Sequence, residues 1–172
     1  MSKALVVVDM QNDFIDGSLG TKEAEGIVNE VVKTIEDPSY DRIFVTMDTH
    51  EKNYLHTFEG EHLPVEHCIK DTPGWELNKD VQEALKGKNY KVIEKPTFGS
   101  WALVQEIGQM HPDEIALVGL CTDICVVSNA LLLRSLLYQT KITVLANACA
   151  GVTVGKHKAA VEVMRSCQIE VK

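Results

Sequence analysis

The feature that most constrains this chain is a regular alternation of short apolar runs with amphipathic segments. Five runs rich in β-branched residues have the length of buried strands, at residues 4–8, 42–47, 91–93, 115–118 and 142–145. Between and after them, 28–35 and 157–164 carry apolar residues at the i, i+3, i+4, i+7 spacing of a helix face. Strands that alternate with helices form right-handed βαβ units. The sequence therefore predicts a three-layer α/β/α fold with a central, mostly parallel sheet covered by helices on both faces.

Two parts of the chain fall outside this alternation. Residues 50–72 are too polar and irregular for a helix or a strand, and a long loop within a compact domain is usually functional or disordered. Residues 168–171 form either a last strand or a frayed tail. The length of 172 residues predicts a single domain over 1–172, large enough for a core and a cleft.

Charge and hydropathy narrow the class of partner. The formal net charge of −8 argues against nucleic acid or an anionic membrane, and no apolar run approaches the roughly 20 residues of a membrane span. The five cysteines form no secreted disulfide framework, and the beginning of the chain is too soon polar for a signal peptide. We therefore expect a cytoplasmic protein with reduced thiols that acts on a small molecule. The apolar stretch 130–137 either lines a homo-oligomer interface or belongs to a helix buried against the sheet.

Three chemically active side chains follow predicted strands. Asp9 comes directly after three valines, where partial desolvation raises a carboxyl pKa toward that of a useful base, although an aspartate there can also cap a turn. Lys95 follows 91–93, where a surface charge is the simpler interpretation. Cys125 lies in GLCTDICV, where a strand turns into a helix whose dipole favours a thiolate. A lone buried cysteine, however, is more often a small core residue.

Taken together, Asp9, Lys95 and Cys125 have the chemistry of a cysteine amidohydrolase. The carboxyl ends of parallel strands share one edge of the sheet, so the three side chains can converge there. Cleavage of an amide by a thiol needs a base, a cation that balances charge, and donors for the oxyanion. Backbone N–H groups of Cys121 and Cys125, in the turn before the helix, are the predicted donors.

A second group of polar side chains lies at the start of the irregular segment and within it. Asp48 and His50 are two residues apart at a strand end, so they point to one side of an extended backbone, and His67 follows in LPVEHC. One carboxylate and two imidazoles suit Zn²⁺, Fe²⁺ or Mn²⁺, with open positions for water or a ligand atom. A solvated loop is the alternative interpretation.

Five motifs give this chain a resemblance to a known family. VDMQNDF, DTH, HC-x₃-TPGWEL, EKPTFGS and GLCTDICV occur in the order found in isochorismatase-like cysteine hydrolases, which have a Rossmann-like α/β fold. Within that family the chain is most similar to the nicotinamidase/pyrazinamidase group. The resemblance spans nearly the whole chain, from the first strand to ACAGVT at 148–153.

The resemblance implies a role for each of the residues singled out above. The three strand-end side chains would form a catalytic triad beside a non-proline cis peptide at Leu120–Cys121. Phe14 and Leu120 would line the substrate pocket. The resemblance also implies a divalent metal ion, with Zn²⁺ preferred over Fe²⁺ or Mn²⁺. Its three constant ligands would be Asp48, His50 and His67. The fourth ligand varies in the family and would here be Glu59, with His56 as the alternative.

The same resemblance implies the activity. Nicotinamide would be hydrolysed to nicotinate and ammonia through a thioester on Cys125, as a step of NAD salvage, with the metal orienting the pyridine ring. The chain departs from the family pattern at two positions near the substrate pocket. Residues 62–65 carry no aromatic residue before the third metal ligand, and Cys121 stands where the family often has a smaller residue. Hydrolysis of another small amide or ureido compound is therefore the alternative. A non-catalytic protein that binds metal or senses thiol oxidation is a third hypothesis.

Overall fold

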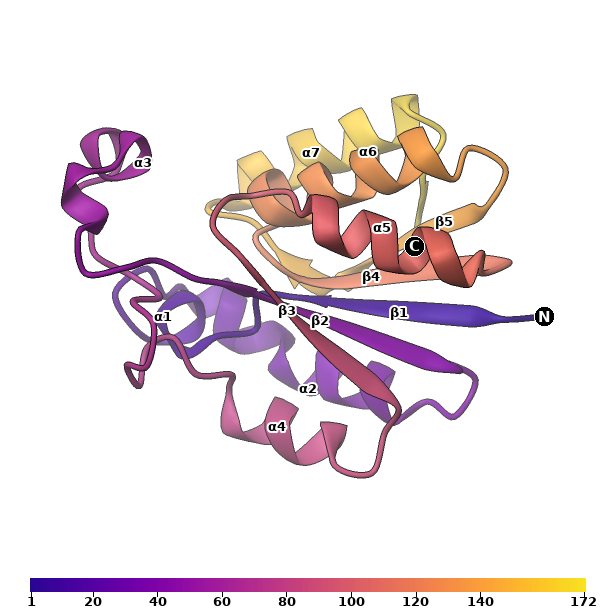
Figure 1. The fold of residues 1–172 in the computed structure, drawn as a ribbon. Helices are drawn as coiled ribbons and strands as arrows, with labels where there is room; N and C mark the ends of the chain where they lie inside the picture. Colours follow the sequence, from indigo (N-terminus) through magenta and orange to yellow (C-terminus); the bar gives the residue numbers. More distant parts are fainter.

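All six strands join one parallel sheet (Figure 1) in the computed structural model, which describes residues 1–172. The strands are β1 (Lys3–Val8), β2 (Arg42–Asp48), β3 (Tyr90–Lys95), β4 (Glu114–Leu120), β5 (Lys141–Ala150) and β6 (Glu170–Val171). Their order in the sheet is β3-β2-β1-β4-β5-β6, and every neighbouring pair is parallel. The predicted parallel sheet is therefore confirmed, and the last predicted strand is present as the short β6.

Helices cover both faces of the sheet, which confirms the predicted three layers (Figure 1). One face carries α1 (Asn12–Ile15), α2 (Lys22–Glu36) and α4 (Lys79–Leu85), and the other carries α5 (Trp101–Met110), α6 (Val127–Leu136) and α7 (Val154–Ser166). Both amphipathic segments predicted from the sequence are helices, namely α2 and α7. The Thr21 side chain caps α2 by accepting from the N–H of Ala24, and Thr153 caps α7 in the same way. None of the helices has the length and apolar character needed to span a bilayer.

Alternate residues of the central strands enter two separate cores. In β1, Leu5 packs with α1, α2 and α4, whereas Val6 packs with α5, α6 and α7. Burial of both faces explains why the strand segments are continuously apolar rather than alternating. Because α6 buries Leu133 in the second core, the apolar stretch 130–137 belongs to a helix packed against the sheet. A homo-oligomer remains a prediction.

The sheet has its topological switch point between β1 and β4. The chain adds β2 and β3 on one side of β1 and then returns to place β4 on the other side. In such sheets, ligands bind in the crevice at the carboxyl ends of the two strands that flank the switch point. Gly119 lets β4 run close to β1 there, because its φ is +118° and a Cβ atom would lie 2.1 Å from the carbonyl oxygen of Val8.

The segment 50–72 is more regular than the sequence predicts. It contains the 3₁₀ turn η1 (Tyr54–His56) and the short helix α3 (Phe58–His62), which projects from the body of the protein in Figure 1. The expectation that this segment holds no regular element was therefore wrong. The side chain of Thr57 accepts from the N–H of Gly60, so a single capping residue is enough to begin a helix too short to show a hydrophobic period.

The close approach of β1 and β4 can be tested with two glycine substitutions. Gly119→Ala should lower the free energy of unfolding by at least about 3 kcal/mol, because the added methyl group meets main-chain atoms that cannot move aside. Gly26 lies in the middle of α2, on its exposed side, with open space around it. Gly26→Ala should therefore raise the free energy of unfolding by about 0.5–1 kcal/mol. Urea unfolding followed by circular dichroism measures both. Equal effects of the two substitutions would contradict this account of Gly119.

Candidate active site

Three buried side chains from different strand ends meet at the switch point. Asp9 follows β1, Lys95 is the last residue of β3, and Cys125 lies in the π-helix η2 (Thr122–Val126) that follows β4. The Nζ atom of Lys95 is 2.7 Å from Oδ2 of Asp9 and 3.5 Å from Sγ of Cys125. All three residues are at most 5% exposed. Since β2 separates β3 from β1, the side chains of Lys95 and Asp9 meet across the carboxyl end of β2.

Burial dominates the protonation of this group. Burial raises the pKa of Asp9, and the Lys95 ammonium only partly opposes this. Burial and the negative charge of Asp9 raise the pKa of the Cys125 thiol well above its ordinary value. Burial alone would lower the pKa of Lys95, but the charges of Asp9, Cys125 and Asp48 raise it, so the ammonium form persists. Burial and the charge of Asp9 therefore oppose the thiolate that the helix dipole was expected to favour, while Lys95 balances negative charge beside the sulfur.

The turn that holds Cys125 leaves backbone N–H groups without a partner. The carbonyl oxygen of Cys121 accepts from the N–H groups of Ile124 and Val126, each at 3.1 Å. The N–H of Cys121 has no protein acceptor, and that of Cys125 has none outside its own π-turn. The peptide bond between Leu120 and Cys121 is cis. These groups can therefore donate to an oxygen atom of a ligand above the thiol.

Four potential metal ligands lie beside the thiol. Asp48, His50, Glu59 and His67 each offer one atom, and these atoms all lie within 4.8 Å of one another. Oδ2 of Asp48 is 2.9 Å from Nε2 of His50 and 3.5 Å from that of His67, and Oε1 of Glu59 is 3.8 and 3.5 Å from the same two nitrogens. Ligands at about 2.0–2.2 Å from a tetrahedral ion are roughly 3.4 Å apart, so the set fits Zn²⁺ or a similar ion. His56 is exposed and lies outside the cluster.

The surroundings orient these ligands. Nδ1 of His67 lies 2.8 Å from the carbonyl oxygen of Val65, which leaves Nε2 facing the cluster. Burial lowers the pKa of His67, but its hydrogen bonds with Asp48 and Glu59 outweigh this effect and raise the pKa to about 10. The pKa of Asp48 is well below its usual value, because bonds to both histidines and the Lys95 charge outweigh its burial. Both shifts have the same origin, because the carboxylates of the cluster stabilise positive charge at this place.

Two positioning residues were missed in the sequence analysis. The hydroxyl of Thr46 donates to Oδ1 of Asp9 at 2.6 Å. The side chain of Gln11 bonds the main chain of Asp48 twice, donating to its carbonyl oxygen at 2.8 Å and accepting from its N–H at 2.7 Å. Gln11 belongs to the motif VDMQNDF. A glutamine so close to the end of a buried strand was the one feature of the sequence that could have indicated its role. Both side chains are fully buried.

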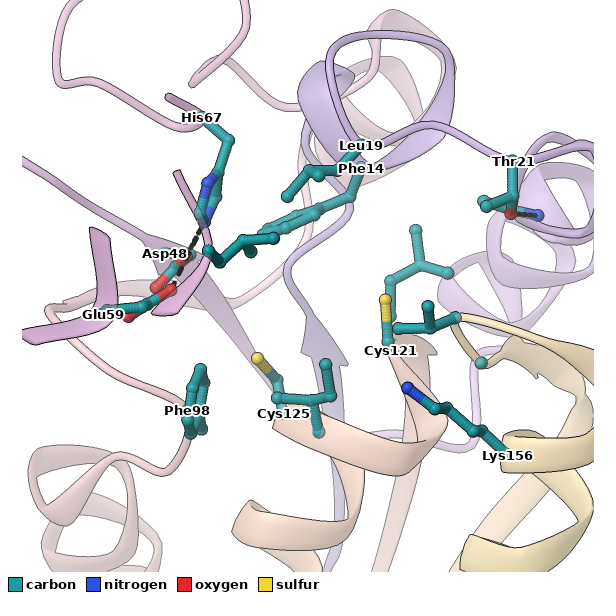
Figure 2. A pocket seen from close by; sticks show the side chains of 16 residues that line it. Phe14, Leu19, Thr21, Asp48, Glu59, His67, Phe98, Cys121, Cys125 and Lys156 are labelled. Carbon is teal, nitrogen blue, oxygen red and sulfur yellow. Dashed lines mark hydrogen bonds and ion pairs between the residues drawn. The ribbon is translucent and has the colours of Figure 1, made fainter. Parts of the chain in front are cut away.

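A small cavity of about 250 Å³ lies above Cys125 (Figure 2). Its walls are mostly apolar, and the predicted wall residues Phe14 and Leu120 both line it. The metal-ligand side chains lie on one side of the thiol, and the amine of Lys156 points into the cavity beside Cys121 (Figure 2). Pockets for drug-sized ligands are typically about 300–1,000 Å³, so this cavity suits a small molecule. The sequence analysis did not identify Lys156 as a lining residue.

Comparisons with known proteins agree with this geometry. The family model "Isochorismatase domain" matches residues 3–171. The nicotinamidase of Saccharomyces cerevisiae is 27% identical over 81% of this chain and 85% of its own length. The crystal structure of a Bacillus subtilis nicotinamidase superposes with a TM-score of 0.85, at 26% identity and 99% coverage of both chains. A Pyrococcus horikoshii pyrazinamidase in complex with zinc superposes with a TM-score of 0.76, at 26% identity, covering 100% of this chain and 99% of that one.

The ligand cluster predicts metal binding that depends on particular histidines. His67→Ala should weaken binding of Zn²⁺ at least about 100-fold, because it removes one of four donors. His56→Ala is the matched control, since its exposed imidazole lies outside the cluster, and should leave the affinity within about twofold. Isothermal titration calorimetry of the metal-free protein measures both constants. Comparable losses in the two variants would show that the cluster does not bind the ion.

Proposed function

The chain belongs to the isochorismatase family, and we propose that it hydrolyses nicotinamide to nicotinate and ammonia. The observation that carries this proposal is the contact of Lys95 with both Asp9 and Cys125 under a small cavity, whose wall includes three of the four potential metal ligands. The nicotinamidases among its relatives support the choice of substrate. A thiol, a base and a buried cation are what cleavage of an amide through an acyl-enzyme requires.

Asp9, Lys95 and Cys125 act as the catalytic triad in this proposal. Asp9 accepts the proton of the Cys125 thiol while the sulfur attacks the amide carbon, and Lys95 keeps the carboxylate in place. Burial raises the pKa of Asp9 above its ordinary value, which makes its carboxylate a stronger base. The oxyanion receives hydrogen bonds from the N–H groups of Cys121 and Cys125, and each such donor contributes about 10²–10³ in rate.

The two halves of the reaction share one base. Asp9 returns its proton to the departing nitrogen, so ammonia leaves and a nicotinoyl thioester remains on Cys125. Asp9 then takes a proton from water as the water oxygen attacks the thioester carbon. Collapse of the second tetrahedral intermediate breaks the C–S bond, and the sulfur recovers its proton from Asp9. Nicotinate is released, and the free thiol is restored.

Asp48, His50, Glu59 and His67 are the proposed metal ligands, with Zn²⁺ as the preferred ion. A bound divalent ion supplies a Lewis-acidic position for the pyridine nitrogen, directly or through a water molecule. The zinc complex of a pyrazinamidase relative supports the choice of ion. Phe14 and Leu120 hold the flat ring between them, which keeps the carboxamide over the sulfur.

The same proposal assigns the chain to NAD salvage, acting as a single domain over 1–172 in the cytoplasm. All five cysteines are free, as the reducing cytoplasm requires.

Lys156 supports a second candidate substrate class, amides or ureido compounds that also carry a carboxylate. Its ammonium group points into the cavity on the side away from the metal ligands, and no carboxylate of the protein lies within ion-pairing distance of it. A neutral nicotinamide molecule forms no ion pair with that ammonium group. An anionic substituent would be attracted to it.

A matched pair of cysteine variants tests the nucleophile. Cys125→Ala should reduce ammonia release from nicotinamide at least about 10⁴-fold without unfolding the protein, because no other group can form the thioester. Cys121→Ala keeps the backbone N–H and should retain activity within about tenfold. A coupled ammonia assay and a thermal melt measure the two effects. Turnover that survives in Cys125→Ala would refute the assignment.

The charge of Lys156 can be tested with a substrate panel. If nicotinamide is the substrate, Lys156→Met should leave its kcat/KM within about threefold, because the neutral ring forms no ion pair with the side chain. If a carboxylate-bearing ureido compound is the substrate, the same substitution should raise its KM at least about tenfold. Ammonia release from both compounds, in wild-type and variant proteins, decides between the two classes.

A further inference from the structure

Helix α7 is hydrogen-bonded to the turn that carries the Cys125 thiol, and we infer that His157 is a positioning residue for that turn. Thr122 is the first residue of η2, and its side chain is fully buried. The hydroxyl of Thr122 lies 2.8 Å from Nδ1 of His157, the fourth residue of α7. The inference rests on the proposed function, because it assigns a role in holding the nucleophile Cys125.

A second contact joins the same two elements. The N–H of Val152, just before α7, donates to Oδ1 of Asp123 in η2 at 2.9 Å. Gly151 makes this approach possible, since a Cβ atom there would lie 2.8 Å both from that oxygen and from the backbone nitrogen of His157. The turn and the beginning of α7 are therefore packed as closely as main-chain atoms allow.

The position of Thr122 determines where the oxyanion donors point. Thr122 directly follows Cys121, and three residues later the chain reaches Cys125. Because Thr122 lies between the two donors, a rotation at Thr122 moves the N–H group of Cys121 relative to the N–H group and the sulfur of Cys125. Helix α7 provides a fixed anchor, since Val161 and Met164 are buried in the core beneath it.

His157 acts through Thr122 and not on the substrate. It is not among the residues that line the cavity above Cys125. Burial lowers the pKa of His157, so its imidazole is neutral, and either partner can donate the hydrogen bond according to the tautomer. Without His157, the buried hydroxyl of Thr122 loses this partner, and the turn is free to adopt another arrangement.

Two pairs of substitutions test the role of this hydrogen bond. His157→Ala and Thr122→Val each remove it and should lower kcat about tenfold to 100-fold with KM within about twofold, because small misplacements of reacting groups cost rate rather than binding. His157→Asn and Thr122→Ser each keep a bonding group and should restore kcat to within about threefold of wild type. The double variant should be no slower than the slower single variant, because both substitutions remove the same contact. Val163→Ala, at an exposed position of the same helix, is the control.

A binding measurement that needs no turnover tests the role of His157 independently of the proposed substrate. An aromatic aldehyde adds to the Cys125 thiol, so that a C–S bond forms and the thiol proton passes to the carbonyl oxygen, which occupies the proposed oxyanion site. Protection of Cys125 from alkylation, mapped by mass spectrometry, gives the affinity of pyridine-3-carbaldehyde. This affinity should fall about tenfold in His157→Ala and recover in His157→Asn.

The outcomes are distinct. If the wild type binds the aldehyde but releases no ammonia from nicotinamide, the proposed substrate is wrong while the aldehyde series still tests His157. If His157→Ala does not fold, the Thr122→Val and Thr122→Ser pair gives the answer in its place. The inference is overturned if His157→Asn is as impaired as His157→Ala, if KM alone changes, or if the two single losses in kcat multiply in the double variant.

Discussion

The buried ion pair between Lys95 and Asp9 is the contact around which the rest of the site is arranged. Removing both charges from water is costly, and the pair is stable only because the 2.7 Å contact and further hydrogen bonds offset that cost. It also requires the observed order of strands. The ends of β3 and β1 are two strand spacings apart, about 10 Å, so the side chains of Lys95 and Asp9 meet only because β3, β2 and β1 are neighbours with their carboxyl ends together. The architecture of the sheet and the chemistry of the site therefore depend on the same contact.

One carboxylate connects this ion pair with the metal-ligand cluster. Oδ1 of Asp48 lies 3.5 Å from Nζ of Lys95, while Oδ2 faces His50 and His67. Gln11 holds the main chain of Asp48 with two buried hydrogen bonds, which fix the point from which the carboxylate extends. The charge in the ligand cluster and the charge beside the thiol are thus coupled through a single rigid residue.

The sequence predicted the elements better than it predicted their environment. The segments of the central strands were recognisable because both of their faces are buried, and the strand-end positions of Asp9 and Cys125 followed directly. The short helix α3 was missed because five residues are too few to show a period. Lys95 alone was best interpreted as a surface charge, because nothing in the local sequence records that another strand end lies across β2. The choice of Glu59 over His56 as a fourth ligand came from family resemblance, since local spacing favours neither.

What the sequence by itself determined is therefore the strands, the helices α2 and α7, the parallel sheet and the residues that follow its strands, because these depend on local hydrophobic pattern. The resemblance of its motifs added the family. Only the tertiary structure decided the burial of the thiol, the partners of Asp48 and Thr122, and the entry of Lys156 into the cavity. Each of these depends on burial and on atoms that are distant in the chain. A pKa or a hydrogen bond is set by what surrounds a group in space, and the order of residues does not contain that information directly.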